Sequence, residues 1–212
     1  MKLGVVLASR GTMFSRTMES VFENTKGHNW KLYMAHGLPI PDCFNVPLKK
    51  ALKDKCDWIW FVEEDMYIPK GTLKRMFELK QPIVTVDYGD KKSGKALILR
   101  NIDESVVFSG MGCLLVKADV FEKLSEPYFK PMVFWKIVED NGDIRYEAHP
   151  EIKETGYGMQ DIYFCWIVNK LGYKIVELPQ AKIGHQRLVA KGGESKSEVD
   201  TVEIVYIKNE NP

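Results

Sequence analysis

Apolar segments of strand length alternate with helix-like segments through the first 88 residues of the chain. The expected strands are Leu3–Ser9, Trp30–Ala35, 57–62 and Pro82–Val86, and the expected helices are 14–24, 44–55 and one that begins at Pro69. Parallel strands need long crossover connections, which are usually helical. The alternation therefore predicts an α/β fold with a mostly parallel, Rossmann-like sheet covered by helices.

The second half of the chain has a different pattern. A polar loop over Gly89–Gly94 precedes a strand-rich stretch in which Asn141-Gly142 predicts a hairpin turn between 132–138 and 144–148. A helix over 159–170 is expected to end at Gly172, before a strand over 173–178. We therefore expect one α/β domain over 1–185. Its first half (1–88) is Rossmann-like and its second half (89–185) is mixed α/β, and 186–212 form a C-terminal tail with an apolar segment at 202–207.

Charge and composition exclude several classes of protein. With 30 Lys and Arg against 29 Asp and Glu, the net charge of +1 lacks the basic footprint of a general nucleic-acid binder, although a small anionic ligand needs only local charge. No apolar run approaches the roughly 20 residues of a membrane helix, so no membrane span is expected. The four cysteines have no metal-binding or Cys-x-x-Cys spacing, which favours a reduced, cytoplasmic setting.

Three acidic residues follow the third expected strand without a gap: Glu63, Glu64 and Asp65. Open α/β sheets bind ligands outside the carboxyl ends of their strands, where this triplet is expected to lie. Adjacent carboxylates repel one another unless they share a cation, and oxygen ligands suit Mg²⁺ or Mn²⁺ bound with a diphosphate. The alternative is an acidic loop before a helix, where the helix dipole favours negative charge.

The segment Asp57-Trp-Ile-Trp-Phe-Val-Glu-Glu-Asp65, followed by Pro69, resembles the strand and Asp-x-Asp motif of nucleotide-sugar-dependent glycosyltransferases of the A-type fold. The resemblance extends from about Leu3 to His185. It implies that Asp65 holds a metal ion on the donor diphosphate. It also implies that Glu63, which stands where the family has Asp, lies near the ribose, with Glu64 between them in the donor site.

Three later stretches resemble the same family in the same order. Gly110-Met-Gly112 precedes an expected strand, and because glycine has no Cβ atom, a ligand or another backbone can approach this segment closely. In the family, the corresponding strand passes under the donor sugar. Asp161, in Gly158-Met-Gln-Asp161, falls on the Asp that serves as general base in inverting members. His185, in Ala181-Lys-Ile-Gly-His185, matches a metal-binding His.

Two stretches near the start of the chain complete the resemblance. Leu7-Ala-Ser-Arg10 matches the exit of the family's first strand, so Ala8, Ser9 and Arg10 are expected to contact the nucleotide. Asn45, which follows Pro39-Ile-Pro41, resembles a second nucleotide-binding segment. For Arg10 an exposed loop cation is the alternative.

As the resemblance implies, these residues predict a metal-dependent glycosyltransferase of the inverting type, whose catalytic domain (1–185) has a nucleotide-binding half (1–88) and an acceptor half (89–185). It would use Mn²⁺ or Mg²⁺ and move a sugar from a nucleoside-diphosphate sugar to an unidentified hydroxyl acceptor: a glycan, a modified nucleic-acid base or a small molecule. Two alternatives stay open. A sugar nucleotidyltransferase would need more glycines and a lysine around Gly11. A non-catalytic carbohydrate- or nucleotide-binding domain would explain Glu63 and Gln160, which depart from the motifs.

Overall fold

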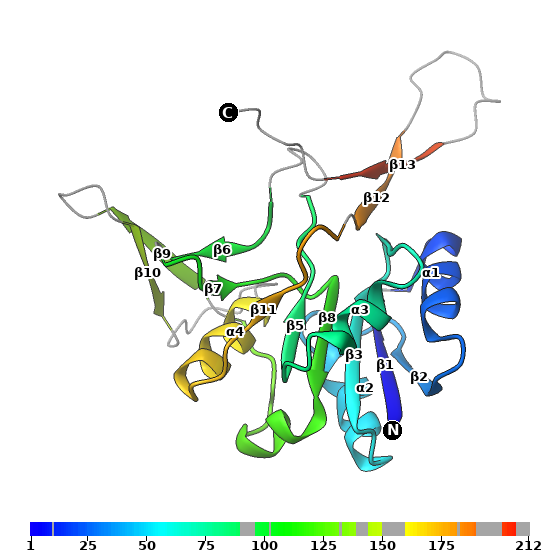
Figure 1. Ribbon diagram of the computed structural model, residues 1–212, viewed down its shortest axis with the longest axis horizontal. Coiled ribbons are helices and arrows are strands. Elements are labelled where there is room, and N and C mark those ends of the chain that lie inside the picture. The colour runs from blue at the N-terminus through cyan, green and yellow to red at the C-terminus, as the bar shows by residue number, and fades with distance from the viewer. Residues whose placement is uncertain are drawn as a thin grey trace.

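A six-stranded sheet forms the centre of the protein in a computed structural model (Figure 1). The structure describes residues 1–9, 11–89, 96–101, 103–131, 133–138, 144–149, 160–181, 183–189 and 201–206. The strand order is β11-β5-β8-β3-β1-β2. β1 pairs in parallel with β2 and β3, and β11 with β5, whereas β8 runs antiparallel to β3 and β5. The sheet is therefore mainly parallel, as the alternation of the sequence predicts.

Apart from the short β4, strands and helices alternate from β1 to β5, and most of the elements after β5 are short strands. The bounds are β1 (Lys2–Ala8), α1 (Ser15–Thr25), β2 (Asn29–Ala35), α2 (Asp42–Lys53), β3 (Trp58–Glu63), β4 (Met66–Tyr67), α3 (Thr72–Glu78), β5 (Ile83–Thr85), β6 (Leu99–Arg100), β7 (Val106–Phe108), β8 (Cys113–Lys117), the 3₁₀ helix η1 (Ala118–Lys123), β9 (Val133–Val138), β10 (Ile144–His149), α4 (Gln160–Lys170), β11 (Val176–Glu177), β12 (Gly184–Val189) and β13 (Thr201–Val205).

The central strands are buried on both faces, which explains their continuous apolar sequences. On β1, Leu3, Val5 and Leu7 join one core cluster with α1 and α3, whereas Val6 and Ala8 join the other with α2 and α4. Alternate residues of a strand point to opposite faces, so the molecule has three layers with the sheet in the middle. The carboxyl ends of β1 and β3 lie at the edge nearest β12 (Figure 1).

Helix α3 corrects one expectation from the sequence. Pro69 does not open this helix, because Gly71 adopts a left-handed conformation (φ 85°) and the helix begins at Thr72. The carbonyl of Pro69 instead accepts bonds from the N–H and the hydroxyl of Thr72. Gly172, by contrast, has the positive φ (80°) of a residue that ends a helix, just after α4.

Small hairpins accompany the sheet in the second half. β9 and β10 pair antiparallel, as predicted, although the expected turn at Asn141-Gly142 lies outside the described residues. β12 pairs with β13 and with β4, so part of the predicted tail forms a small sheet of its own. Among the described residues, no helix has both the length and the apolar character that a membrane crossing requires.

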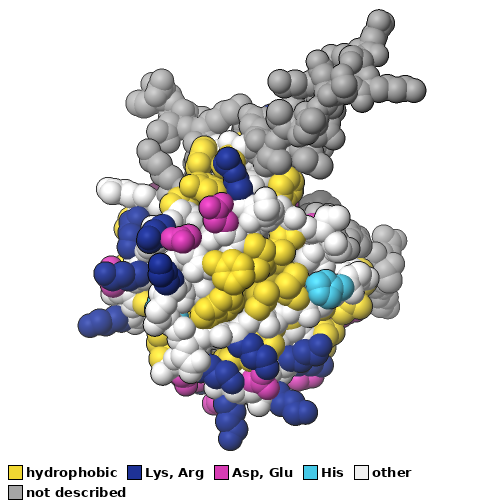
Figure 2. All heavy atoms as spheres, turned by 90° about the vertical axis from the view of Figure 1, so that its right-hand side faces the viewer, with side chains coloured by type: hydrophobic (Ala, Val, Ile, Leu, Met, Phe, Trp, Pro, Cys, Tyr) yellow, Lys and Arg dark blue, Asp and Glu magenta, His cyan; other side chains and the backbone are white. Residues whose placement is uncertain are grey.

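The side of the molecule formed by α1 and β2 carries an apolar patch with Lys and Arg side chains around it (Figure 2). Of the large apolar side chains on these two elements, Phe22 is the most exposed, and its ring meets Trp30 edge-on at 5.7 Å between centroids. β2 is the outermost strand on this side of the sheet. The acidic turn 63–65 lies at the carboxyl-end edge of the sheet, just after β3.

Candidate metal and ligand site

Backbone contacts from two distant segments hold the acidic turn after β3. The carbonyl of Glu64 accepts bonds from the N–H of Phe14 (3.1 Å) and the hydroxyl of Thr17 (2.9 Å) at the start of α1. The carbonyl of Asp65 accepts the N–H of Gln186 (2.7 Å). The backbone of the turn is thereby fixed while the side chains of the acidic residues line a pocket.

The pairing of β12 with β4 brings His185 to the acidic turn. His185 stands opposite Met66, the residue after Asp65, although the two segments are about 120 residues apart. Gln186 strengthens this junction, because its side-chain amide donates to the hydroxyl of Thr17 (3.0 Å) and to the carbonyl of Met66 (3.1 Å). The register of these strands therefore determines which side chain faces Asp65.

The contact between His185 and Asp65 requires a proton or a metal ion between the two side chains. Nδ1 of His185 lies 3.0 Å from the carbonyl oxygen of Gly89, which can only accept, so Nδ1 carries a proton. Nε2 lies 3.3 Å from Oδ1 of Asp65, and both residues are buried. A neutral imidazole would point its lone pair at a buried carboxylate, which is unfavourable unless a proton or a metal ion lies between them.

Glu63 completes a group that could hold a metal ion. One ligand atom from each of Glu63, Asp65 and His185 lies within 4.8 Å of the other two. Atoms that share an ion at about 2.1 Å are at most about 4.2 Å apart, so small side-chain rotations would close the group. The donor set fits a divalent cation, and the structure adds Glu63, which the resemblance places near the ribose, to the predicted pair of Asp65 and His185.

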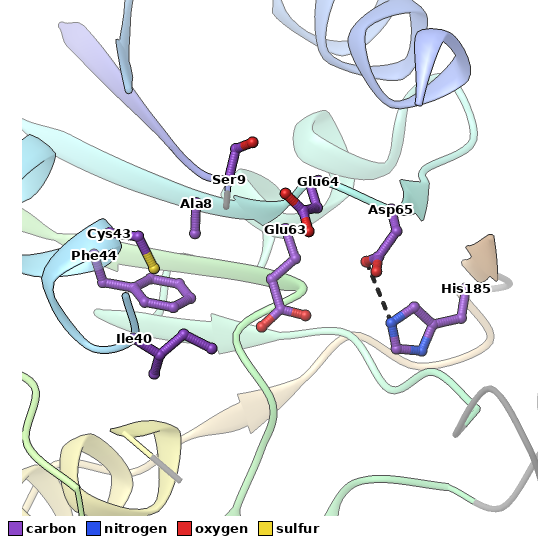
Figure 3. Close-up of a pocket in the computed structure, with 9 residues that line it drawn as sticks. All are labelled: Ala8, Ser9, Ile40, Cys43, Phe44, Glu63, Glu64, Asp65 and His185. Atoms are coloured by element: carbon purple, nitrogen blue, oxygen red, sulfur yellow. Dashed lines mark ion pairs between the residues drawn. The ribbon is translucent and has the colours of Figure 1, made fainter. Parts of the chain in front are cut away.

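A pocket of about 170 Å³ lies beside this group (Figure 3). The carboxylates of Glu63 and Asp65 and the imidazole of His185 point into one space, and apolar side chains lie on the far side of Glu63. The pocket thus has a charged end and an apolar end. Its lining residues are Ala8, Ser9, Ile40, Cys43, Phe44, Glu63, Glu64, Asp65 and His185.

Five of the residues predicted to contact the donor line this pocket, but others do not. Asn45 does not line it: this residue is buried, and both ends of its side-chain amide bond the backbone of Phe129, at 2.9 Å and 3.0 Å. The amide thus anchors a distant segment, whereas its neighbour Phe44, which sequence reasoning missed, lines the pocket. Arg10 lies outside the described residues.

In the glycine segment before β8, the group that lies close to the backbone is a side chain of the protein itself. A Cβ on Gly110 would lie 2.1 Å from the hydroxyl of Tyr88, and one on Gly112 would lie 2.7 Å from Cζ of the same ring. The N–H of Gly112 donates to that hydroxyl (2.9 Å). Tyr88 therefore occupies the space over Gly110 and Gly112 that was predicted for the donor sugar, and Met111 between them is fully buried.

Asp161 stands in the first turn of α4, and its Oδ1 accepts the N–H of Ile162 (3.0 Å). Burial raises the pKa of its carboxyl, which makes its ionised form a stronger base than an exposed carboxylate. The pKa of the Tyr88 hydroxyl is also raised, first by burial and then by the charges of Glu63, Asp161 and Asp65. Asp161 thus lies within electrostatic reach of the same ring as the metal group.

Fold and site together define a mixed α/β protein with a carboxylate–histidine group at the carboxyl edge of a mainly parallel sheet. The sequence matches no protein-family model and no curated protein. Among solved structures, A197 from STIV is similar over 87% of this chain and 85% of its own, with a TM-score of 0.58 and 16% identity. The two proteins therefore share a fold.

A second solved structure is 4-diphosphocytidyl-2C-methyl-D-erythritol synthase from Anaerococcus prevotii. It matches 80% of this chain and 98% of its own at 12% identity, and its TM-score of 0.36 is too low to indicate a common fold.

Proposed function

We propose that this protein is a metal-dependent glycosyltransferase of the A-type fold, which moves a sugar from a nucleoside-diphosphate sugar to an acceptor hydroxyl. The observation that carries the proposal is the group of Glu63, Asp65 and His185, which could hold a metal ion, at the edge of the sheet where α/β folds bind ligands. The resemblance of the motifs around Asp65, Asp161 and His185 to that family supports it.

The two ends of the pocket suit the two ends of such a donor. Ile40, Cys43 and Phe44 offer an apolar surface for a flat base, while Glu63 and Asp65 lie where a diphosphate would meet a cation. Diphosphates bind to carboxylates only through a metal ion, because the charges otherwise repel. Two carboxylates with one imidazole suit Mn²⁺, which accepts both oxygen and nitrogen ligands.

In the proposed reaction, Glu63, Asp65 and His185 would hold a divalent ion, which would supply Lewis-acid stabilisation of negative charge on the departing diphosphate. The Asp161 carboxylate takes the proton of the acceptor hydroxyl. The acceptor oxygen forms a bond to the anomeric carbon as the bond from that carbon to the diphosphate oxygen breaks, and the diphosphate leaves with the electron pair. Attack opposite the leaving group inverts the anomeric centre.

The test compares the wild-type chain with Asp161→Asn on a panel of nucleoside-diphosphate sugars with Mn²⁺. Donor binding is measured by calorimetry and turnover by release of nucleoside diphosphate. General-base assistance typically contributes about 10²–10⁴-fold, so turnover should fall by that factor while donor affinity stays nearly constant. The matched control is Asp119→Asn, which should leave turnover unchanged. Asp119 is an exposed acidic residue on η1 that pairs with Lys117 at the end of β8.

Each alternative gives a different result. A wild-type chain that binds no nucleotide sugar in the presence of Mn²⁺ contradicts the proposal. Metal-dependent binding without any turnover, over the whole panel and a range of acceptors, would indicate a non-catalytic domain of the same fold. Normal turnover by a folded Asp161→Asn protein would remove the base and, with it, the argument for inversion.

A further inference from the structure

Tyr88 joins the metal group to the glycine segment. Its side chain is 2% exposed, its hydroxyl accepts the N–H of Gly112, and its ring meets the imidazole of His185 edge-on at 5.2 Å between centroids. A ring in this position blocks rotation of the imidazole toward the glycine segment. No other aromatic ring contact to His185 is present among the described residues.

The next residue along the chain holds the same imidazole by a hydrogen bond. The carbonyl of Gly89 accepts the Nδ1 proton of His185 (3.0 Å). Two consecutive residues therefore fix two properties of His185: the ring of Tyr88 limits its orientation, and the carbonyl of Gly89 selects its tautomer. Second-sphere contacts of this kind keep a histidine ready to bind a metal ion.

Asp87 anchors this pair of residues. Its Oδ1 accepts three backbone N–H groups, from Tyr88 (2.8 Å), Leu97 (3.0 Å) and Ile98 (3.1 Å). These bonds tie the backbone of Tyr88 to the chain that returns ten residues later. The ring position is thus set from both ends, by Asp87 at the backbone and by Gly112 at the hydroxyl.

We propose that Tyr88 is a positioning residue, which together with Gly89 holds the imidazole of His185 in the Nδ1–H tautomer with Nε2 directed at Asp65. Gly110 and Gly112 are glycines because any side chain there would displace this ring. The consequence for metal affinity rests on the proposed function, whereas the orientation of the imidazole does not.

The experiment uses Tyr88→Leu, Tyr88→Phe and a matched control, Phe121→Leu, which removes a ring that is also 2% exposed but packs in the other core cluster. Imidazole ¹⁵N–¹H spectra of the metal-free proteins, assigned with His185→Ala and recorded at a pH high enough for the imidazole to be neutral, report the tautomer of His185. Wild type, Tyr88→Phe and Phe121→Leu should show the Nδ1–H tautomer, and Tyr88→Leu should show a mixture.

Mn²⁺ affinity is measured on the same four proteins by titration. Loss of a second-sphere contact typically lowers metal affinity about 10–100-fold, which we expect for Tyr88→Leu alone. Thermal unfolding should show that Phe121→Leu and Tyr88→Leu lose comparable stability. A difference in Mn²⁺ affinity then comes from the loss of the ring beside His185 and not from a loss of stability. Tyr88→Phe should recover most of the affinity, because it keeps the ring on His185.

The proposal is overturned if Tyr88→Leu keeps the pure Nδ1–H tautomer. It is also overturned if its Mn²⁺ affinity falls no further than that of Phe121→Leu while His185→Ala abolishes binding. If His185→Ala leaves Mn²⁺ affinity unchanged, the metal group of the proposed function is wrong, and the tautomer spectra still decide the role of Tyr88.

Discussion

The acidic turn 63–65 and the glycine segment 110–112 were both predicted to face the donor, but their surroundings differ. At the turn, contacts from α1 and β12 go to the backbone carbonyls, and the acidic side chains line the pocket. At the glycine segment, the Tyr88 ring covers the backbone. Charged residues at the end of a buried strand thus predicted a pocket more directly than glycines did.

The physical reason is that the two signals carry different information. A carboxylate after an apolar strand must reach solvent or a cation, because burying its charge alone is costly. A glycine within a strand indicates only that something approaches closely, and another side chain of the same protein satisfies that requirement. The variants below are expected to separate these two kinds of site.

The largest effect is expected at Asp65. Asp65→Asn removes a charged ligand from the metal group, and because loss of a second-sphere contact alone costs about 10–100-fold, Mn²⁺ affinity should fall more than about 100-fold. Calorimetry with Mn²⁺ measures it, and EDTA should mimic the loss of Mn²⁺-dependent nucleotide binding. Glu64→Gln is the matched control, since it removes the same charge from a neighbour outside the metal group, and equal losses in both variants would contradict the assignment.

A smaller effect, on stability rather than binding, is expected at Asn45. Asn45→Ala would leave the buried N–H and carbonyl of Phe129 without their partners, which should cost about 2–4 kcal/mol of unfolding free energy. Denaturant unfolding measures this loss, and donor affinity of the folded protein should hardly change. Asn169→Ala, which removes a single partly buried bond to the carbonyl of Val107, should cost less. A selective loss of donor affinity in Asn45→Ala would restore the original prediction.

At the glycine segment, Gly110→Ala would place a methyl group against the Tyr88 hydroxyl. Overpacking of this kind costs about 1–3 kcal/mol of unfolding free energy. In a double-mutant cycle, Tyr88→Ala should relieve the cost of Gly110→Ala, because the clashing ring is gone. Strictly additive effects would show that the glycine serves something other than the ring.

The smallest effect is a pH dependence at Asp161. Because burial raises the pKa of this carboxyl in the folded state, the folded protein holds the proton more tightly than the unfolded chain. The stability that this group contributes is complete below its unfolded pKa of about 3.9 and is lost as pH rises through the folded pKa. Asp161→Asn should therefore gain stability relative to wild type between acid and neutral pH, as denaturant unfolding at several pH values would show. A difference that is constant with pH would mean that the carboxyl is not shifted.

The sequence by itself determined the mainly parallel sheet and the position of the acidic turn. Apolar strands alternating with helices leave few other ways to pair, and a strand buried on both faces must end where its charged residues begin. β3 follows this rule, since it is buried up to Val62 and ends at the half-buried Glu63. The short, widely separated strands were harder to predict, because two residues of β4 carry no periodic signal.

Only the tertiary structure decided which side chains meet. His185 reaches Asp65 through the register of β12 on β4, and a shift of one residue would turn it to the other face. The sequence did not predict the contacts of Tyr88 and Asn45, because the partners of both lie far away in the sequence: 24 residues from Tyr88 to Gly112 and 84 from Asn45 to Phe129. Such contacts depend on how layers pack, which no local pattern of residues encodes.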